Sequence, residues 1–266
     1  LGPTIPASRV ASWNGTSWSS MNIGFAGTVY ALVLDSTDTL YAGGTFGWAN
    51  AANSGDMGAT VVNGVAKWNG SAWEALGTGA DGADGANDLN ALAVDSSDNV
   101  YAGGNFATMS GVANTARIAK WNGSAWSALG RGVSNEVNAL LVFGNELYVA
   151  GSFTYADAPT SSTPGALTAN RIARFNLNDN TWGLLGSGMN TGAIINALAV
   201  TGTDLYVGGS FVTAGGKVAG YAAYADINPP PVVNAGANGT VDEGSAFVQA
   251  GSFDDPGMDS WTATVD

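Results

Sequence analysis

The stretch IAKWNGSAWSALG, residues 118–130, decides the fold, because close copies of it occur along the chain. VASWNG begins at residue 10, VAKWNG at residue 65 and IARFNL at residue 172. The aromatic anchors Trp13, Trp68, Trp121 and Phe175 are separated by 55, 53 and 54 residues. Regular spacing of this length is the signature of a repeat architecture, in which each repeat is one supersecondary unit.

A second block recurs between these copies, as YAGGTF (41–46), YAGGNF (101–106), YVAGSF (148–153) and YVGGSF (206–211). Each repeat therefore contains four short predicted strands: an apolar run such as NALAV, the Tyr block, the Trp-Asn-Gly block and a closing run such as WSAL. Asn-Gly accepts the positive φ angles of a tight turn, so it predicts a hairpin between the third and fourth strands. Four-stranded repeats without helical periodicity predict an all-β chain, a β-propeller of four or five four-stranded blades.

Side-chain sizes agree with blades that narrow toward a central axis. The first two strands are rich in Ala and Gly, whereas the third and fourth strands carry most of the tryptophans. The chain begins within a third strand, at residues 10–13, and leaves the repeats near another, at residues 221–225. We therefore expect the last pair of inner strands to pair with the first pair of outer strands and close a ring.

The repeat resembles the kelch repeat of bacterial extracellular proteins. LYVGG at residues 205–209 resembles the double-glycine strand of that family, and RFNLNDNTW at residues 174–182 resembles its aromatic, turn and Trp pattern. The resemblance covers residues 9–226 and implies that residues 1–226 form a propeller used mostly for binding. The other three repeats depart from the family, because a bare Asn-Gly replaces the longer turn.

The composition changes after residue 226. The run NPPP at residues 228–231 predicts a stiff linker. The following residues resemble the opening of a PKD-type immunoglobulin-like module, so residues 227–266 are expected to form an incomplete sandwich with open sheet edges. Open edges recruit further strands. The tail is therefore expected either to continue into a longer chain or to join copies of the protein into an extracellular filament or surface layer.

The amino-acid composition excludes several classes of function. The chain has no Cys and no His, which removes thiol nucleophiles, disulfides and imidazole chemistry. Its formal charge of −13 disfavours nucleic acid as a partner, and no apolar run is long enough for membrane insertion. A surface dominated by Gly, Ala, Ser, Thr and Asn, with scarce Lys, indicates an extracellular or cell-surface location.

One face of the blades is predicted to bind the ligand. Because blade strands alternate in direction, the long connections at residues 47–64, 77–88, 107–117 and 154–171 lie on the same face. Trp48 either packs under its own loop or is exposed for stacking on a sugar or for a protein interface. The neighbouring candidates for the binding of a glycan or protein are Met57, Met109 and Tyr155.

Carboxylates suggest two further sites. Asp81, Asp84 and Asp88 in a Gly-rich stretch either are solvated turn residues or bind calcium, the one cofactor that the pattern suggests. Asp56, Glu136 and Asp157 could form the carboxylate pair of a propeller glycosidase. We nevertheless expect a non-catalytic protein with no catalytic residues, since no other catalytic pattern accompanies these carboxylates.

Overall fold

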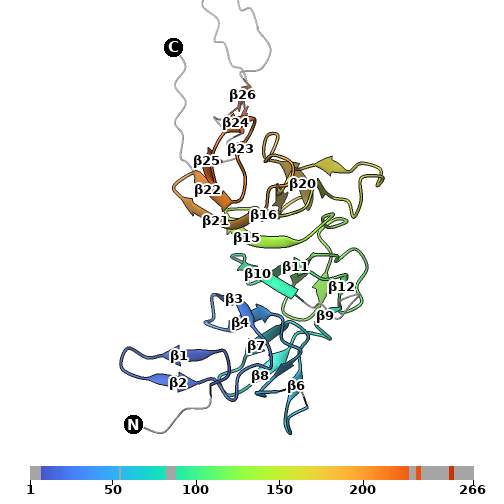
Figure 1. The fold of residues 1–266 in the computed structure, drawn as a ribbon. Coiled ribbons are helices and arrows are strands. Elements are labelled where there is room, and N and C mark those ends of the chain that lie inside the picture. The colour runs from blue at the N-terminus through green and yellow to red at the C-terminus, as the bar shows by residue number, and fades with distance from the viewer. Residues whose placement is uncertain (1–6, 54, 82–87, 228–231, 235–251, 255–266) are drawn as a thin grey trace, which may run out of the picture. The chain divides into compact units, whose positions relative to one another are not determined.

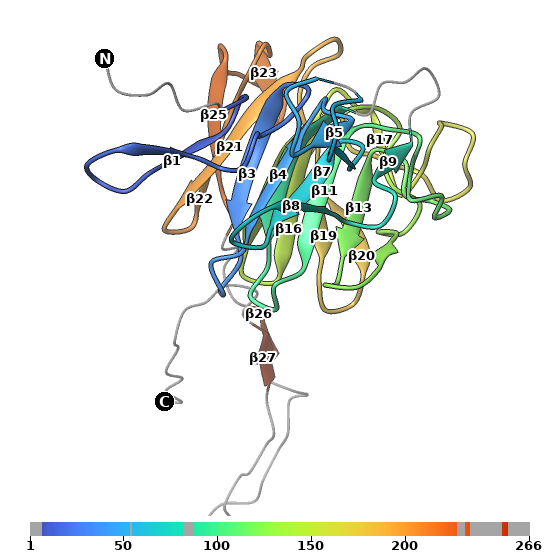
Figure 2. The same cartoon turned by 90° about the horizontal axis from the view of Figure 1, so that it is seen from below.

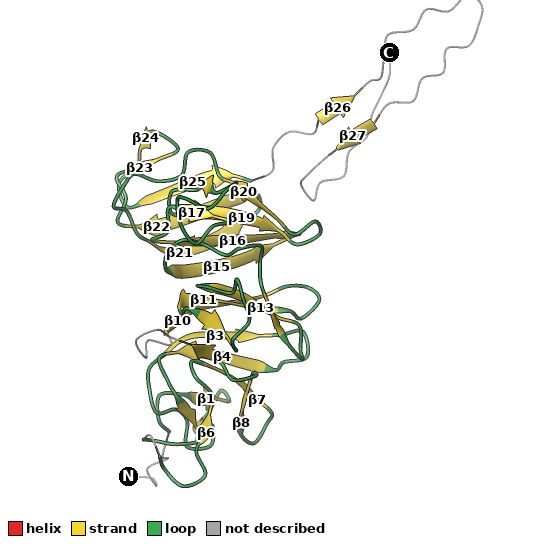
Figure 3. Cartoon of the chain, turned by 90° about the vertical axis from the view of Figure 1, so that its right-hand side faces the viewer, coloured by secondary structure: helices red, strands yellow, loops and turns green. Residues whose placement is uncertain are grey.

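The structure, a computed structural model, describes residues 7–53, 55–81, 88–227, 232–234 and 252–254. The chain divides into two units, Leu1–Leu198 with Val207–Ala223, and Ala199–Tyr206 with Tyr224–Asp266. The described residues form strands, turns and loops without a helix (Figure 3). Accordingly, this described part has no helix that could cross a membrane.

Three complete blades follow one another in the first unit (Figure 1). In sheet order, the first blade consists of β3 (Val29–Leu34), β4 (Leu40–Gly44), β7 (Val65–Trp68) and β8 (Trp73–Ala75). The second blade consists of β10 (Asp88–Val94), β11 (Val100–Asn105), β13 (Ile118–Trp121) and β14 (Trp126–Ser127). The third blade consists of β15 (Val137–Phe143), β16 (Glu146–Gly151), β19 (Ile172–Asn176) and β20 (Thr181–Leu184). The predicted all-β fold of four-stranded propeller blades is confirmed, with the predicted strand order.

Two incomplete sheets accompany these blades. The last sheet has three strands, in the order β21 (Ile195–Thr201), β22 (Asp204–Gly209) and β25 (Ala222–Asp226). At the other end, β1 (Ala11–Trp13) and β2 (Trp18–Ser20) form a hairpin with sequences of the third-strand and fourth-strand type. This hairpin projects from the first unit in both Figure 1 and Figure 2.

The Asn-Gly turns join the outer strands as predicted. Gly70 has a φ of +96°, a backbone conformation that side chains other than that of glycine rarely adopt. Asn69 Oδ1 accepts hydrogen bonds from the backbone N–H groups of Ser71 and Ala72, which fixes the turn. Trp68 and Trp73 then lie opposite each other, with ring centroids 5.3 Å apart.

Successive blades pack through small residues of the second strand. A Cβ atom at Gly43 of the first blade would lie 3.2 Å from Leu92 Cγ of the second blade. At the equivalent Gly103, a Cβ atom would lie 2.5 Å from Val137 Cγ1 of the third blade. The absence of a side chain therefore lets the first strand of each following blade approach closely, which buries the apolar clusters between blades.

The predicted ring closure is wrong for the described strands. β22 has β25 as its third-strand partner, and β1 pairs with β2 alone. The physical reason is chain connectivity: β25 follows β22 after residues 210–221, whereas three blades separate β1 from β22. A short loop loses less conformational entropy on closure than a long one, so the nearby strand competes better for the same edge.

The tail contributes one described hairpin. β26 (Val232–Asn234) and β27 (Ser252–Asp254) pair in antiparallel fashion. The rest of the predicted PKD-type module, including residues 235–251 and 255–266, lies outside the described residues. The immunoglobulin-like sandwich therefore stays a prediction.

Candidate functional site

The long connections of the predicted binding face contain short two-stranded sheets. β5 (Trp48–Ala49) pairs with β6 (Thr60–Val61), and β17 (Tyr155–Ala156) pairs with β18 (Leu167–Thr168). β23 (Thr213–Ala214) pairs with β24 (Lys217–Val218), whereas β12 (Thr108–Met109) pairs with β9 (Ala80–Asp81) from the connection that enters the same blade. Backbone pairing thus holds these connections in place.

The short sheets occur at equivalent places in the repeats, although the sequences of the connections do not repeat. In every repeat the connection that enters a blade bridges to the long connection of that blade. The bridged pairs are Phe25 with Ala49, Ala80 with Met109, Val133 with Ala156 and Met189 with Ala214. The residue directly before each bridged residue of the long connection is equivalent in all four repeats, and it is half-buried in each of them. These residues are Trp48, Thr108, Tyr155 and Thr213.

This equivalence shows which of the four predicted binding residues lie at the surface and which are buried. Trp48 and Tyr155 occupy the same position in two repeats, and both residues are half-buried. Met109 occupies the adjacent position, whose side chain points to the opposite side of the strand, and it is 0% exposed in the core between the first two blades. Met109 therefore packs inside the protein and cannot contribute to an exposed binding surface. Met57, between β5 and β6, is 100% exposed.

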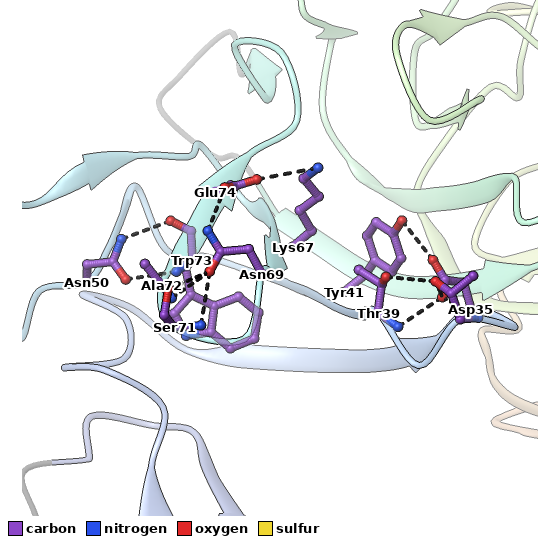
Figure 4. Close-up of polar contacts among 11 residues, drawn as sticks. Asp35, Thr39, Tyr41, Asn50, Lys67, Asn69, Ser71, Ala72, Trp73 and Glu74 are labelled. Carbon is purple, nitrogen blue, oxygen red and sulfur yellow. Dashed lines mark hydrogen bonds and ion pairs between the residues drawn. The ribbon is translucent and has the colours of Figure 1, made fainter.

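A polar side chain two residues after Trp48, and another two residues after Tyr155, fixes the local backbone by hydrogen bonds. Asn50 has a φ of +57° and is buried. Its Nδ2 donates to Trp73 O and its Oδ1 accepts from Trp73 N, both at 2.9 Å (Figure 4). In the third blade Asp157, with a φ of +52°, accepts hydrogen bonds from Arg131 N at 2.9 Å and Arg131 Nη2 at 3.0 Å. The backbone beside Trp48 and Tyr155 is therefore held by hydrogen bonds as well as by strand pairing.

Only part of the predicted calcium site can be located. Asp81 is exposed, and its Oδ2 accepts hydrogen bonds from Thr108 Oγ1 at 3.0 Å and Gly111 N at 2.8 Å. Asp88 begins β10 and pairs with Asn105, whereas Asp84 lies outside the described residues. Within the described ranges, no group of three or more acidic, His or Cys side chains is placed to hold a metal. Calcium binding stays a prediction.

The carboxylates considered for glycosidase chemistry have local partners. Asp56 Oδ2 accepts from Ala52 N at 3.0 Å and from Asn53 N at 2.8 Å. Glu136 Oε1 accepts from Asn90 Nδ2 at 2.8 Å, and Asp157 forms the ion pair with Arg131. These contacts give each carboxylate a structural role, and the absence of catalysis stays a prediction.

Two Asp–Tyr pairs that the sequence analysis missed stabilise the opposite face. Tyr41 Oη donates to Asp35 Oδ2 at 3.1 Å in the first blade (Figure 4), and Tyr101 Oη donates to Asp95 Oδ2 at 2.7 Å in the second. Burial and then the Asp35 carboxylate raise the pKa of Tyr41 to about 12. Burial alone would raise the pKa of Asp35, but hydrogen bonds from Thr37, Thr39 and Tyr41 together lower it. The signal in the sequence is an Asp six residues before the Tyr of the second strand.

Comparison with known proteins supplies no family. No family model matches the sequence, and no curated protein matches it significantly. Among solved structures, the extracellular domain of BT4673 from B. thetaiotaomicron aligns with 69% of this chain and 19% of that chain, at 13% identity and a TM-score of 0.43. YCF48 bound to D1 peptide aligns over 77% and 56% of the two chains, at 16% identity and a TM-score of 0.42. The computationally designed Ika8 protein aligns over 75% and 58%, at 14% identity and a TM-score of 0.42. The chain thus spans less than two thirds of each of these proteins.

Proposed function

We propose that this chain is a non-catalytic extracellular binding propeller, and that a glycan or a protein binds at the face formed by the long connections. The observation that carries the proposal is the placement of Trp48 and Tyr155 at one equivalent position of two repeats, each of them half-buried and so in part accessible to a ligand. Equivalent positions of a repeat lie on one face, and Thr108 and Thr213 occupy this position in the other two repeats.

The chemistry of the two rings suits such a ligand. Trp and Tyr offer a flat apolar surface together with one hydrogen-bond donor, and aromatic side chains dominate the energetics of many interfaces. The strand pairing of β5 with β6 and β17 with β18 limits the loss of backbone entropy on binding, because these segments are ordered before the ligand arrives. The charge of −13 favours a neutral or basic ligand over a polyanion.

Glycan arrays and cell-surface binding assays with the whole chain test the proposal. Trp48→Ala and Tyr155→Ala should each weaken binding by about 2 kcal/mol, which is roughly 30-fold in Kd. Tyr224→Ala is the matched control, since Tyr224 is exposed but lies on β25, outside the long connections. Ligand binding that survives both substitutions would show that another surface binds the ligand.

A further inference from the structure

The β1–β2 hairpin occupies the place of the outer half of a blade, and no inner half of that blade lies among the described residues. In each complete blade the fourth-strand Trp donates its indole N–H to a carbonyl in the preceding repeat. Trp126 Nε1 donates to Leu76 O at 2.8 Å, and Trp182 Nε1 donates to Leu129 O at 3.0 Å. Trp73 Nε1 of the first blade donates in the same way to Met21 O, just after β2, at 3.2 Å. The hairpin therefore stands before the first blade as a preceding repeat would.

Among the described residues, no inner strands lie in front of the first blade. Leu92 and Val94 of β10 pack into the core between the first and second blades. Their equivalents in β3, Leu32 and Leu34, are 53% and 55% exposed. Val33, which points to the other side of β3, does pack against the second blade. The exposed face of β3 therefore has the apolar residues with which other first strands pack on the preceding blade, but here no blade of the described chain covers them.

The last sheet has two inner strands, but its third strand, β25, lacks the large apolar residues of the other third strands. Its backbone register matches the complete blades, because Gly209 N donates to Tyr221 O as Gly104 N donates to Arg117 O. This register places Ala222 where the other third strands have an aliphatic residue, and Ala225 where they have an aromatic one. The aliphatic residues at that position are Val10, Val65, Ile118 and Ile172, and the aromatic ones are Trp13, Trp68, Trp121 and Phe175. β25 is therefore a weaker third strand than β1.

Complete blades make three kinds of contact with the next blade that, among the described residues, are not made at the two ends of the propeller. For each of them, one partner lies in the last repeat and the other lies in β3 or the β1–β2 hairpin. Gly43 and Gly103 receive a neighbouring blade, whereas among the described atoms a Cβ atom at Gly208 would meet only Ala197 Cβ, at 3.8 Å. Leu32 is the residue that would pack there. Asn138 Nδ2 donates to Ile195 O of the next repeat at 3.2 Å, and the equivalent Asn196 has no such acceptor among the described residues. Trp18, 60% exposed, has no indole acceptor there. In sequence, Leu185 is the equivalent of Leu76 and Leu129, whose carbonyls accept from the Trp of the next repeat.

We propose that a second copy of this chain completes the unfinished blade. Strands β21 and β22 of one copy insert in front of β3 of the next copy, where β22 exchanges its partner β25 for β1. The shared blade then has inner strands from one chain and outer strands from the other. Leu32 packs on Gly208 of the second copy, Trp18 Nε1 donates to Leu185 O, and Asn196 Nδ2 donates to Val29 O. This head-to-tail contact leaves one free end at each side, so it builds chains or closed rings of copies.

The second copy is favoured because the contact continues an interface that the chain already builds between its own blades. Within one chain the two ends do not pair in this structure: β22 pairs with β25 and β1 pairs with β2. The inference does not depend on the proposed ligand. It also differs from assembly through residues 227–266, because it uses the inner strands of the blades.

Disulfide trapping tests the shared blade directly, since the chain has no Cys of its own. In complete blades the second-strand Tyr lies opposite a fixed third-strand position, as Tyr41 opposite Lys67 and Tyr101 opposite Lys120. The same register in the shared blade pairs Tyr206 of one copy with Ser12 of the other. Cross-strand neighbours at such a non-hydrogen-bonded position lie about 4.5 Å apart between Cα atoms, within the range of a disulfide. Full-length Ser12→Cys and Tyr206→Cys chains are therefore mixed in equal amounts, oxidised and separated on a non-reducing gel.

The proposal predicts a disulfide-linked heterodimer from the mixture, and a ladder of oligomers from a chain that carries both substitutions. Adding Leu32→Glu to the Ser12→Cys chain should reduce the heterodimer at least about tenfold, whereas adding Val61→Glu, at a similarly exposed residue of β6, should leave it unchanged. A doubly substituted chain that forms only an internal disulfide would overturn the proposal, because the chain would then close on itself. A mixture that stays monomeric at every protein concentration would overturn it as well.

Discussion

The second blade and the last sheet carry nearly the same second-strand block, YAGGNF and YVGGSF, but they differ in burial. Tyr101 is 0% exposed, whereas the equivalent Tyr206 is 42% exposed. The second blade has the third blade packed against Gly103, and its own third strand supplies Ile118 and Trp121 to the cores. The comparison teaches that the block specifies a strand, whereas the neighbouring blade determines how much apolar surface that strand buries.

The largest expected effect distinguishes a buried Trp from its exposed equivalent. Trp126→Ala removes a buried ring and its hydrogen bond to Leu76 O, so it should lower the free energy of unfolding by about 3–5 kcal/mol. Trp18→Ala, at the equivalent position of the β1–β2 hairpin, should lower it by less than about 1 kcal/mol in the monomer. Urea denaturation at low protein concentration measures both, and equal losses would show that the β1–β2 hairpin has a covered face.

A second pair of substitutions tests the role of the small residues. Gly103→Ala places a methyl group 2.5 Å from Val137 Cγ1, so it should destabilise the protein by about 1–3 kcal/mol. Within the described part of the chain, the methyl group of Gly208→Ala meets only Ala197 Cβ, at 3.8 Å. The substitution should therefore stabilise the monomer by about 0.5 kcal/mol, because alanine restricts the unfolded chain. Thermal unfolding of the two variants should therefore shift in opposite directions. Shifts of the same sign would contradict the view that the last sheet has a free face.

Calcium should act on the second blade and not on the last sheet. The connection that enters the second blade carries Asp81, Asp84 and Asp88, whereas residues 186–194 before β21 contain no carboxylate. Calcium at ten times its Kd should stabilise the folded state by about 1.4 kcal/mol, and EDTA should remove this gain. Asp81→Asn should abolish the shift. Identical melting temperatures in calcium and in EDTA would leave these residues as solvated turn positions.

The smallest expected effect concerns the Asp95–Tyr101 pair, since Thr201 stands in the last sheet where the second blade has Asp95. Burial would raise the pKa of Asp95, but hydrogen bonds from Tyr101, Asn99 and Ser97 together lower it. A carboxyl with a lowered pKa contributes stability above its unfolded pKa, and this contribution disappears as the pH falls through the folded value. Asp95→Asn should therefore destabilise the protein by no more than about 1 kcal/mol at neutral pH. The difference from the unsubstituted chain should shrink below about pH 4, as measured by urea unfolding across pH.

The candidate site was only partly predictable from the sequence. Trp48 is a binding candidate from the sequence alone, but its equivalence to Tyr155 required the bridges from Ala49 to Phe25 and from Ala156 to Val133. Met109 was a candidate for binding but is buried. The connections share no sequence pattern from which the inward position of a two-residue strand could be recognised. The Asp–Tyr pairs were missed for a different reason: the Asp residues are typical of turns, and only the fold brings each one to the Tyr of the next strand.

The sequence by itself determined the repeat, the four strands of each blade, their order and the turns between the outer strands. These features depend on local periodicity and on residues such as Gly70, whose positive φ few other residues adopt. The tertiary structure alone decided which strand completes the last sheet and which faces stay exposed. β1 and β25 both have third-strand sequences, and their competition for the edge of β22 depends on loop closure and on the blades packed between them. A pattern within one strand cannot contain that information, because the same strand is buried or exposed according to the neighbour that it meets.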